Sequence, residues 1–236
     1  MGHHESPQHE LQCHAHEHGP FDFIGDVHGC FHTFSTLLRH WRPATERLVQ
    51  VGDLVDRGTD SPGVVELARQ LQQHDPANAV FLLGNHDWGM AQHLGPGGPL
   101  PEWLGWGGRE TLHQYHSRHP GWLGPHTAWL AERPYFWEND HLLISHAGRA
   151  DTTFPFDPTN PDGSLWRRGP LLNVGKLQVV GHTPTDDGHP RFNAATQALY
   201  LDTGAYRGQA LTGVRLSEAG EVLKIISLPT DPRDLS

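Results

Sequence analysis

The chain is poor in cysteine, in positive charge and in long apolar segments. Only Cys13 and Cys30 are present among the 236 residues, which is too few for the disulfide framework that stabilises small secreted domains. No signal peptide or transmembrane segment precedes the first apolar run. We therefore expect a cytoplasmic protein with free thiols that does not bind a membrane.

The shortage of positive charge limits the choice of ligand. Lysine and arginine number 17 against 27 aspartates and glutamates, which gives a net charge of −10 with histidine neutral. An acidic surface disfavours nonspecific binding to the phosphates of nucleic acid. A small phosphorylated substrate stays compatible with this charge, because bound metal ions would invert the local potential. The 20 histidines are more than packing alone requires, so metal binding must be considered.

The length of the chain suits one sizeable domain. Residues 1–20 contain six histidines among polar residues and show no apolar periodicity, so we expect a disordered tail there. The alternate histidines of this tail could instead scavenge a transition metal. We assign residues 21–236 to a single folded domain.

Three apolar segments each end in a glycine that is followed by a polar residue. Residues 21–24 precede Gly-Asp-Val-His-Gly (25–29), residues 48–51 precede Gly-Asp-Leu-Val-Asp-Arg-Gly (52–58), and residues 79–83 precede Gly-Asn-His-Asp (84–87). From Asp26 to Asp53 is 27 residues and from Asp53 to Asn85 is 32, about the length of a β-α-β unit. Parallel strands present their ligands at their carboxyl ends, so the spacing favours one shared site over three unrelated turns.

The rest of the chain alternates helical and extended patterns. We predict a helix after residue 31, a helix with Ser61 as N-cap and Pro62 in its first turn, and a helix over residues 109–119. Residues 135–137 and 141–144 read as a hairpin, residues 177–180 and 198–204 as strands, and residues 211–216 and 222–228 as antiparallel strands. Apolar segments also precede His146 and His182. A lone histidine there is usually a core residue, but the pair would complete a ligand set.

The three glycine motifs resemble the signatures of the phosphoprotein phosphatase family of metallophosphoesterases. The shorter bacterial and phage branch is the most similar, because it also has Gly-His-Thr-Pro (181–184), Leu-Asp-Thr-Gly (201–204) and a Trp-Leu…Gly-Gly…Thr-Leu segment like residues 103–112. That last segment could line the cleft or pack over the core. The resemblance extends over residues 21–216 and implies an α/β fold, a two-layer β-sandwich flanked by helices with a dinuclear metal centre at one edge.

The resemblance also implies the site, residue by residue. It gives the first metal Asp26, His28 and Asp53, makes Asp53 the bridge, and gives the second metal Asn85, His146 and His182. Two divalent ions, manganese, iron or zinc, need such a shared anion and activate water for in-line attack on phosphorus.

Four further residues would perform the remaining chemistry. Arg57 would hold the phosphate oxygens, and His86 would be the general acid, with its proton held by Asp56. A bond from Asp56 to Arg57 is the structural alternative. Arg167 and Arg168 are both candidates for a second phosphate clamp, and Arg168 fits the Trp-x-Arg pattern of the family.

These residues predict a phosphomonoesterase that acts as a serine/threonine or dual-specificity protein phosphatase. Asp87 stands where protein phosphatases of the family have glutamate and is similar to symmetrical diadenosine tetraphosphate hydrolases, which gives the alternative. The substrate is then a phosphorylated protein or a small molecule such as a dinucleoside polyphosphate. A binding scaffold without catalysis is a third hypothesis, which the complete ligand set disfavours, and a metal buffer built on the tail is a fourth.

Overall fold

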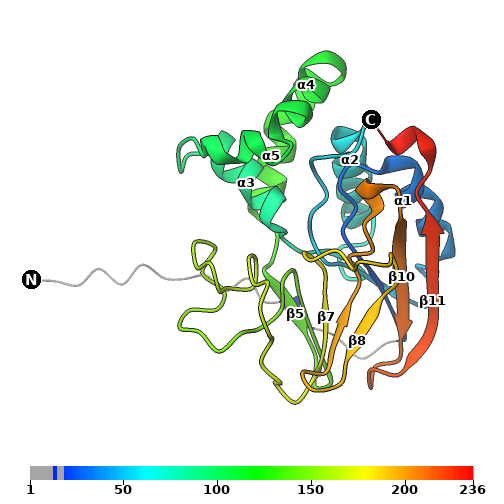
Figure 1. The fold of residues 1–236 in the computed structure, drawn as a ribbon. Helices are drawn as coiled ribbons and strands as arrows, with labels where there is room; N and C mark the ends of the chain where they lie inside the picture. Colours follow the sequence, from blue (N-terminus) through cyan, green and yellow to red (C-terminus); the bar gives the residue numbers. More distant parts are fainter. Residues whose placement is uncertain (1–12, 15–18, 236) are drawn as a thin grey trace, which may run out of the picture.

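Two mixed β-sheets form the centre of the molecule in the computed structural model, which describes residues 13–14 and 19–235 (Figure 1). One sheet has five strands in the order β11 (Val222–Pro229), β10 (Ala210–Leu216), β2 (Phe21–Ile24), β3 (Arg47–Gln50) and β4 (Ala79–Phe81). The other has six in the order β1 (Cys13–His14), β5 (Phe136–Glu138), β6 (Leu142–Ser145), β7 (Leu177–Val180), β9 (Ala198–Tyr200) and β8 (Arg191–Asn193). The predicted α/β sandwich is confirmed.

The strands that precede the predicted ligands are parallel neighbours. In the five-stranded sheet β2 pairs with β3 and β3 with β4, and in the six-stranded sheet β6 pairs with β7 and β7 with β9. The antiparallel pairs are β5 with β6, β8 with β9, and β10 with both β2 and β11. Because parallel strands end at the same edge, their following loops meet there.

The core has two layers. Alternate residues of the central strands, such as Phe21, Phe23 and Val49, meet Trp137 and Ile144 of the facing sheet. Residues of the opposite parity, including Ile24 and Leu48, pack against the helices. A strand buried on both faces explains why apolar residues occupy successive positions, as at Phe23 and Ile24 or at Leu48 and Val49, rather than alternating strictly with polar ones.

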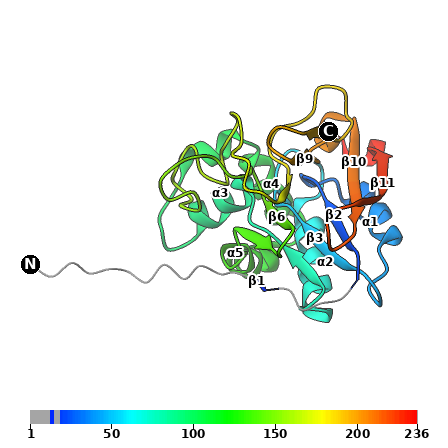
Figure 2. The same ribbon diagram turned by 90° about the horizontal axis from the view of Figure 1, so that it is seen from below.

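The helices lie in two groups (Figures 1 and 2). Helices α1 (Phe31–Leu37) and α2 (Ser61–His74) accompany the five-stranded sheet, and α3 (Asn85–Leu94), α4 (Gly108–Arg118) and α5 (Leu123–Ala131) form a lobe beside it. Short 3₁₀ turns are η1 (Leu38–His40), η2 (Pro101–Gly105), η3 (Pro120–Trp122), η4 (Ala205–Arg207) and η5 (Pro232–Asp234). Helices α3 and α5 and strand β8 are absent from the sequence prediction.

One cap prediction is wrong. The N-cap of α2 is Asp60, whose carboxylate accepts a hydrogen bond from the Gly63 N–H at 3.1 Å. Ser61 is the first helical residue, and its hydroxyl accepts from the backbone N–H of Asp56 at 2.9 Å. The serine therefore supports the loop that carries Asp56, and the neighbouring aspartate takes over the cap.

The predicted tail lies largely outside the described residues. Of residues 1–20, the structure describes only 13–14 and 19–20, and Cys13–His14 pairs parallel with β5 as strand β1. The boundary at residue 21 stays a prediction. Across residues 13–14 and 19–235, none of the helices combines the length and the apolar character that a bilayer crossing requires.

Candidate metal centre

The six predicted metal ligands converge at the carboxyl ends of five strands. Each belongs to the segment that directly follows β2, β3, β4, β6 or β7. All six are at most 5% exposed, namely Asp26, His28, Asp53, Asn85, His146 and His182. Polar groups buried this deeply need partners.

Asp53 is the centre of the group. Its Oδ2 lies 3.4 Å from His28 Nε2 and 3.4 Å from His146 Nε2. Ligand atoms of His28, Asp53 and His86 lie within 4.8 Å of one another, and so do those of Asp26, Asp53 and His146. Asp53 belongs to both sets, which is the position that a bridging carboxylate requires.

Backbone carbonyls fix the orientation of the three histidines. His28 Nδ1 lies 2.9 Å from the Val55 carbonyl and His146 Nδ1 lies 3.1 Å from the Val51 carbonyl. His182 uses its other nitrogen, Nε2, which lies 3.2 Å from the Trp166 carbonyl. In a neutral imidazole, a nitrogen that donates to a carbonyl leaves its ring partner with a free lone pair, so each of the three histidines offers one nitrogen to the site when it is neutral.

Burial keeps two of these imidazoles neutral. It lowers the pKa of His28 to about 3 and that of His182 well below its usual value. Asn85 Oδ1 lies 2.9 Å from His146 Nε2 and 2.9 Å from His182 Nδ1. With both nitrogens unprotonated, three lone pairs would face one another, and a cation between them would relieve that repulsion.

The surroundings of Asp26 indicate independently that these residues fit a bound metal ion. Its Oδ1 is buried and has no hydrogen-bond partner in the described part of the chain. Burial, followed by the charges of Asp202 and Asp53, raises its pKa well above the usual value. Carboxylates that are buried this close together repel one another, and a divalent cation between them would compensate their charge. The residues therefore fit a dinuclear centre of nitrogen and oxygen ligands.

The backbone is strained at the same place. Seven non-glycine residues in the described part of the chain have positive φ, and five of them belong to the site: His28, Asp53, Asp56, Arg57 and His182. Each such residue costs on the order of 1–3 kcal/mol, and strain of this kind collects at functional sites.

Two glycines permit the close approach of the loops. A Cβ at Gly84 would overlap the backbone and carboxylate of Asp53, and one at Gly181 would overlap Asp26 Oδ1. A residue with a Cβ would therefore not fit directly before Asn85 or directly before His182.

The predicted acid pair lies beside the ligands. His86 Nδ1 lies 2.7 Å from Asp56 Oδ2, and Arg57 Nη2 lies 3.1 Å from His86 Nε2. Because a guanidinium can only donate, His86 Nε2 accepts here and Nδ1–H donates to Asp56. The geometry thus favours the pairing of Asp56 with His86 over the alternative pairing with Arg57.

The segment around residues 103–112 supports Asp56 directly. Trp103, fully buried, donates from Nε1 to Asp56 Oδ2 at 2.9 Å, and Thr111 Oγ1 donates to Asp56 Oδ1 at 2.6 Å. Sequence reasoning left the role of this segment open between cleft wall and core packing. No local pattern marks a donor that lies 47 residues from its acceptor.

Asp87 organises the loop that carries Asp53. Its Oδ2 accepts from the N–H groups of Asp53 at 2.8 Å and Gly84 at 3.1 Å, and its Oδ1 accepts from Leu54 at 2.9 Å and Val55 at 3.3 Å. From the sequence, Asp87 is expected only to distinguish between substrate classes. Here it fixes the backbone on both sides of the candidate bridging ligand.

A cavity of about 100 Å³ opens onto the ligands. Arg57 and Arg168 line it, whereas Arg167 turns away to Asp162 and the Pro170 carbonyl. Tyr206 also lines the cavity, with its ring 4.2 Å from Arg57 Cζ.

Two charged residues of this cavity escaped the sequence analysis. Arg207 lines it from η4. Asp202 lines it with an Oδ2 that has no hydrogen-bond partner among residues 13–14 and 19–235, and burial raises its pKa to about 6. The Leu-Asp-Thr-Gly motif (201–204) could have identified Asp202 as a residue of the site.

Comparisons with known proteins agree with this geometry. The family model of the calcineurin-like phosphoesterases matches residues 19–206. The asymmetrical bis(5'-nucleosyl)-tetraphosphatase PrpE of Geobacillus sp. (strain WCH70) is 30% identical over 245 residues, which cover 89% of this chain and 96% of that protein.

Solved structures share the fold. A protein serine/threonine phosphatase from Saccharomyces cerevisiae has a TM-score of 0.64 at 16% identity and covers 93% of this chain and 82% of its own. A cold-active protein-tyrosine phosphatase of Shewanella sp. has a TM-score of 0.61 at 17% identity, with 90% and 81% covered. The family match over residues 19–206 agrees with the sandwich fold and with the candidate ligands that gather around Asp53 at the strand ends. The chain is therefore a metallophosphoesterase and belongs to the calcineurin-like phosphoesterase family.

Proposed function

We propose that the protein is a metal-dependent hydrolase of dinucleoside polyphosphates. The observation that carries this proposal is the 30% identity to a relative named as an asymmetrical tetraphosphatase, over 96% of that relative's length. From the sequence, a protein phosphatase is the first prediction and a symmetrical tetraphosphate hydrolase the second. The order changes because the phosphatase structures, at 16% and 17% identity, support the shared fold alone.

The proposed metal assignment follows the convergence on Asp53. One ion would be held by Asp26, His28 and Asp53, and the other by Asp53, Asn85, His146 and His182. When bound, such a pair of ions polarises the phosphoryl oxygens and makes water nucleophilic at neutral pH. Manganese is the ion for a first assay, with iron and zinc as the other candidates.

The protein side chains would orient the phosphate and move the leaving-group proton. Arg57 and Arg168 point charge-assisted donors at the cavity, where they would bind equatorial oxygens of the phosphoryl group. His86 Nε2 faces the same cavity. When His86 carries both ring protons, Asp56 stabilises the imidazolium, and Nε2–H is the proton that His86 would give to the leaving oxygen.

Tyr206 and Trp103 would act through these groups. The Tyr206 ring lies against the Arg57 guanidinium and 5.0 Å from the His28 ring, which restricts the position of the arginine. The Trp103 N–H donates to Asp56 and holds the carboxylate in position to accept the hydrogen bond from His86. Both are positioning residues in this proposal.

The test is an assay of the purified protein with manganese and two substrates, diadenosine tetraphosphate and a phosphoserine peptide. We expect cleavage of the tetraphosphate, with chromatography separating the asymmetrical products, a nucleoside mono- and triphosphate, from two diphosphates. His86→Asn is the matched control, because it alters the acid and leaves the predicted ligands in place. Dephosphorylation of the peptide with an intact tetraphosphate would refute the proposal and restore the phosphatase prediction.

A further inference from the structure

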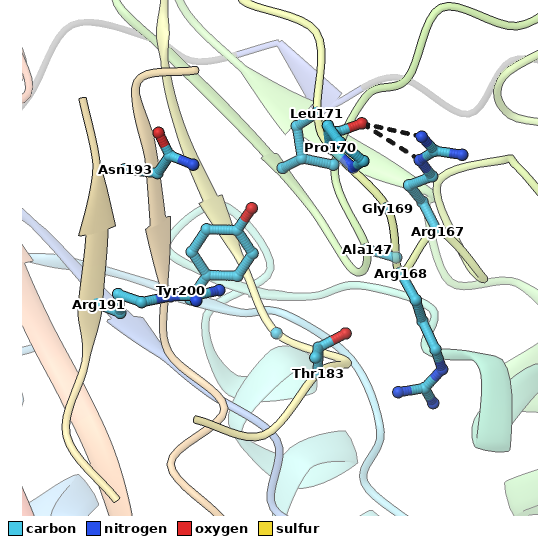
Figure 3. A pocket seen from close by; sticks show the side chains of 11 residues that line it. Ala147, Arg167, Arg168, Gly169, Pro170, Leu171, Thr183, Arg191, Asn193 and Tyr200 are labelled. Carbon is cyan, nitrogen blue, oxygen red and sulfur yellow. Dashed lines mark hydrogen bonds between the residues drawn. The ribbon is translucent and has the colours of Figure 1, made fainter. Parts of the chain in front are cut away.

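A second pocket opens next to the metal centre, on the six-stranded sheet (Figure 3). Its volume is about 260 Å³, and its walls include Arg168, Leu171, Thr183, Arg191, Asn193 and Tyr200. Pockets that enclose a drug-sized ligand usually measure about 300–1,000 Å³. This pocket is therefore suited to one end of an extended substrate whose other end lies elsewhere.

The pocket adjoins the cavity of about 100 Å³ that opens onto the candidate ligands. Arg168 lines both, and Thr183 in the second pocket lies between His182 and Pro184, which line the first. Figure 3 shows Arg167 and Arg168 extending in opposite directions, with the Arg167 guanidinium on the Pro170 carbonyl. A phosphate chain bound at the metal centre would pass Arg168 on its way into the second pocket.

Strands β8 and β9 supply the outer wall. Arg191 and Tyr200 are directly paired across the two strands, and the guanidinium lies 4.6 Å from the ring centroid. The ring fixes the position of an arginine that is otherwise exposed. Within the described residues, no carboxylate lines this pocket, although the chain as a whole carries ten more acidic than basic residues. The local charge therefore favours an anion.

Asn193 adds a directional donor. Its Oδ1 accepts from the Ala195 N–H at 3.0 Å and so closes the β8–β9 turn. This bond fixes the amide with its Nδ2 group available to a ligand. A planar arginine fork, an amide N–H and an aromatic ring form a set that suits a phosphate joined to a nucleoside.

We propose that this pocket binds the distal phosphate and nucleoside of a dinucleoside polyphosphate, and that Arg191 and Tyr200 thereby determine substrate specificity. The inference rests on the proposed function and adds the place where the part of the substrate beyond the scissile phosphate is held. A simple aryl phosphate has no such part and would not reach β8.

The test compares kcat/KM for diadenosine tetraphosphate and for p-nitrophenyl phosphate, with manganese present, in Arg191→Gln and Tyr200→Leu. A hydrogen bond to a charged group contributes enough for about a 10-fold change. We expect the ratio of the two kcat/KM values to fall about 10-fold in Arg191→Gln, mainly through KM for the tetraphosphate, and to fall also in Tyr200→Leu. Arg39→Gln, the same change at an exposed position of η1, should keep the wild-type ratio.

Three outcomes would overturn the inference. The ratio in both variants could match the Arg39→Gln control, both substrates could lose activity equally, or a phosphoserine peptide could be affected as strongly as the tetraphosphate. Failure of the proposed function looks different, because the wild-type protein itself would then cleave p-nitrophenyl phosphate and leave the tetraphosphate intact.

Discussion

Replacement of Asp87 by asparagine tests how the bridging ligand is held. The carboxylate accepts four backbone N–H groups, two on each oxygen. Asparagine replaces one oxygen by an NH₂ group, so two buried N–H donors lose their acceptor. Each buried donor without a partner costs about 1–3 kcal/mol, and the expected loss is therefore about 2–6 kcal/mol. A typical domain has only about 5–15 kcal/mol of stability in total.

Urea unfolding at about pH 8.5 measures this loss with Asp87 ionised, since burial raises its pKa to about 7. The measured change is a net value, because the ionised carboxylate carries a desolvation cost at this pH that asparagine lacks. With a slope of about 2 kcal/mol/M, the midpoint should fall by roughly 1–3 M. Asp151→Asn, the same change on an exposed side chain, should unfold at the wild-type midpoint. If Asp87→Asn also unfolds there, the four N–H contacts do not stabilise the loop and the reasoning is refuted.

Three further changes address other parts of the account. His86→Asn should retain bound metal but reduce kcat by about 10²–10⁴-fold, as measured by metal analysis and steady-state kinetics; unchanged turnover would remove His86 from the mechanism. Gly181→Ala should weaken metal binding, because the new Cβ displaces the Asp26 carboxylate, and a manganese titration with wild-type affinity would contradict the proposed role of Asp26. Hydrogen bonds, that from Arg69 first, lower the pKa of Glu66 from 4.5 to about 2, so the stability from this group is complete above pH 4.5 and is lost as the pH falls toward 2. Thermal melting should show a smaller loss over that interval in Glu66→Gln, and parallel curves would refute this link.

The convergence of the candidate ligands could be predicted from the sequence, because strand ends set the geometry. Asp26, Asp53 and Asn85 follow apolar segments at the spacing of β-α-β units, and parallel pairing of β2, β3 and β4 brings them to one edge. The histidines follow β6 and β7 in the same manner. At these positions the local sequence pattern and the order of the strands lead to the same edge of the sheet. The local pattern is therefore enough to expect the candidate ligands together.

The supporting contacts could not be predicted, because they depend on how separate elements pack. The donors to Asp56 come from η2 and α4, 47 and 55 residues along the chain. Likewise, Asp60 rather than Ser61 caps α2, because the serine hydroxyl is bonded to the Asp56 backbone in the folded protein. Strand β8 is exposed along its whole length, so it lacks the apolar signal that identifies buried strands.

The most direct test of the central claim is the number of manganese ions bound per chain at equilibrium, measured by mass spectrometry of the metal after dialysis, in the wild-type protein and in Asp53→Asn. If Asp53 is the shared ligand of both sites, the wild-type chain holds two ions and the single substitution weakens both sites together. Two ions retained by Asp53→Asn with undiminished affinity would contradict the account.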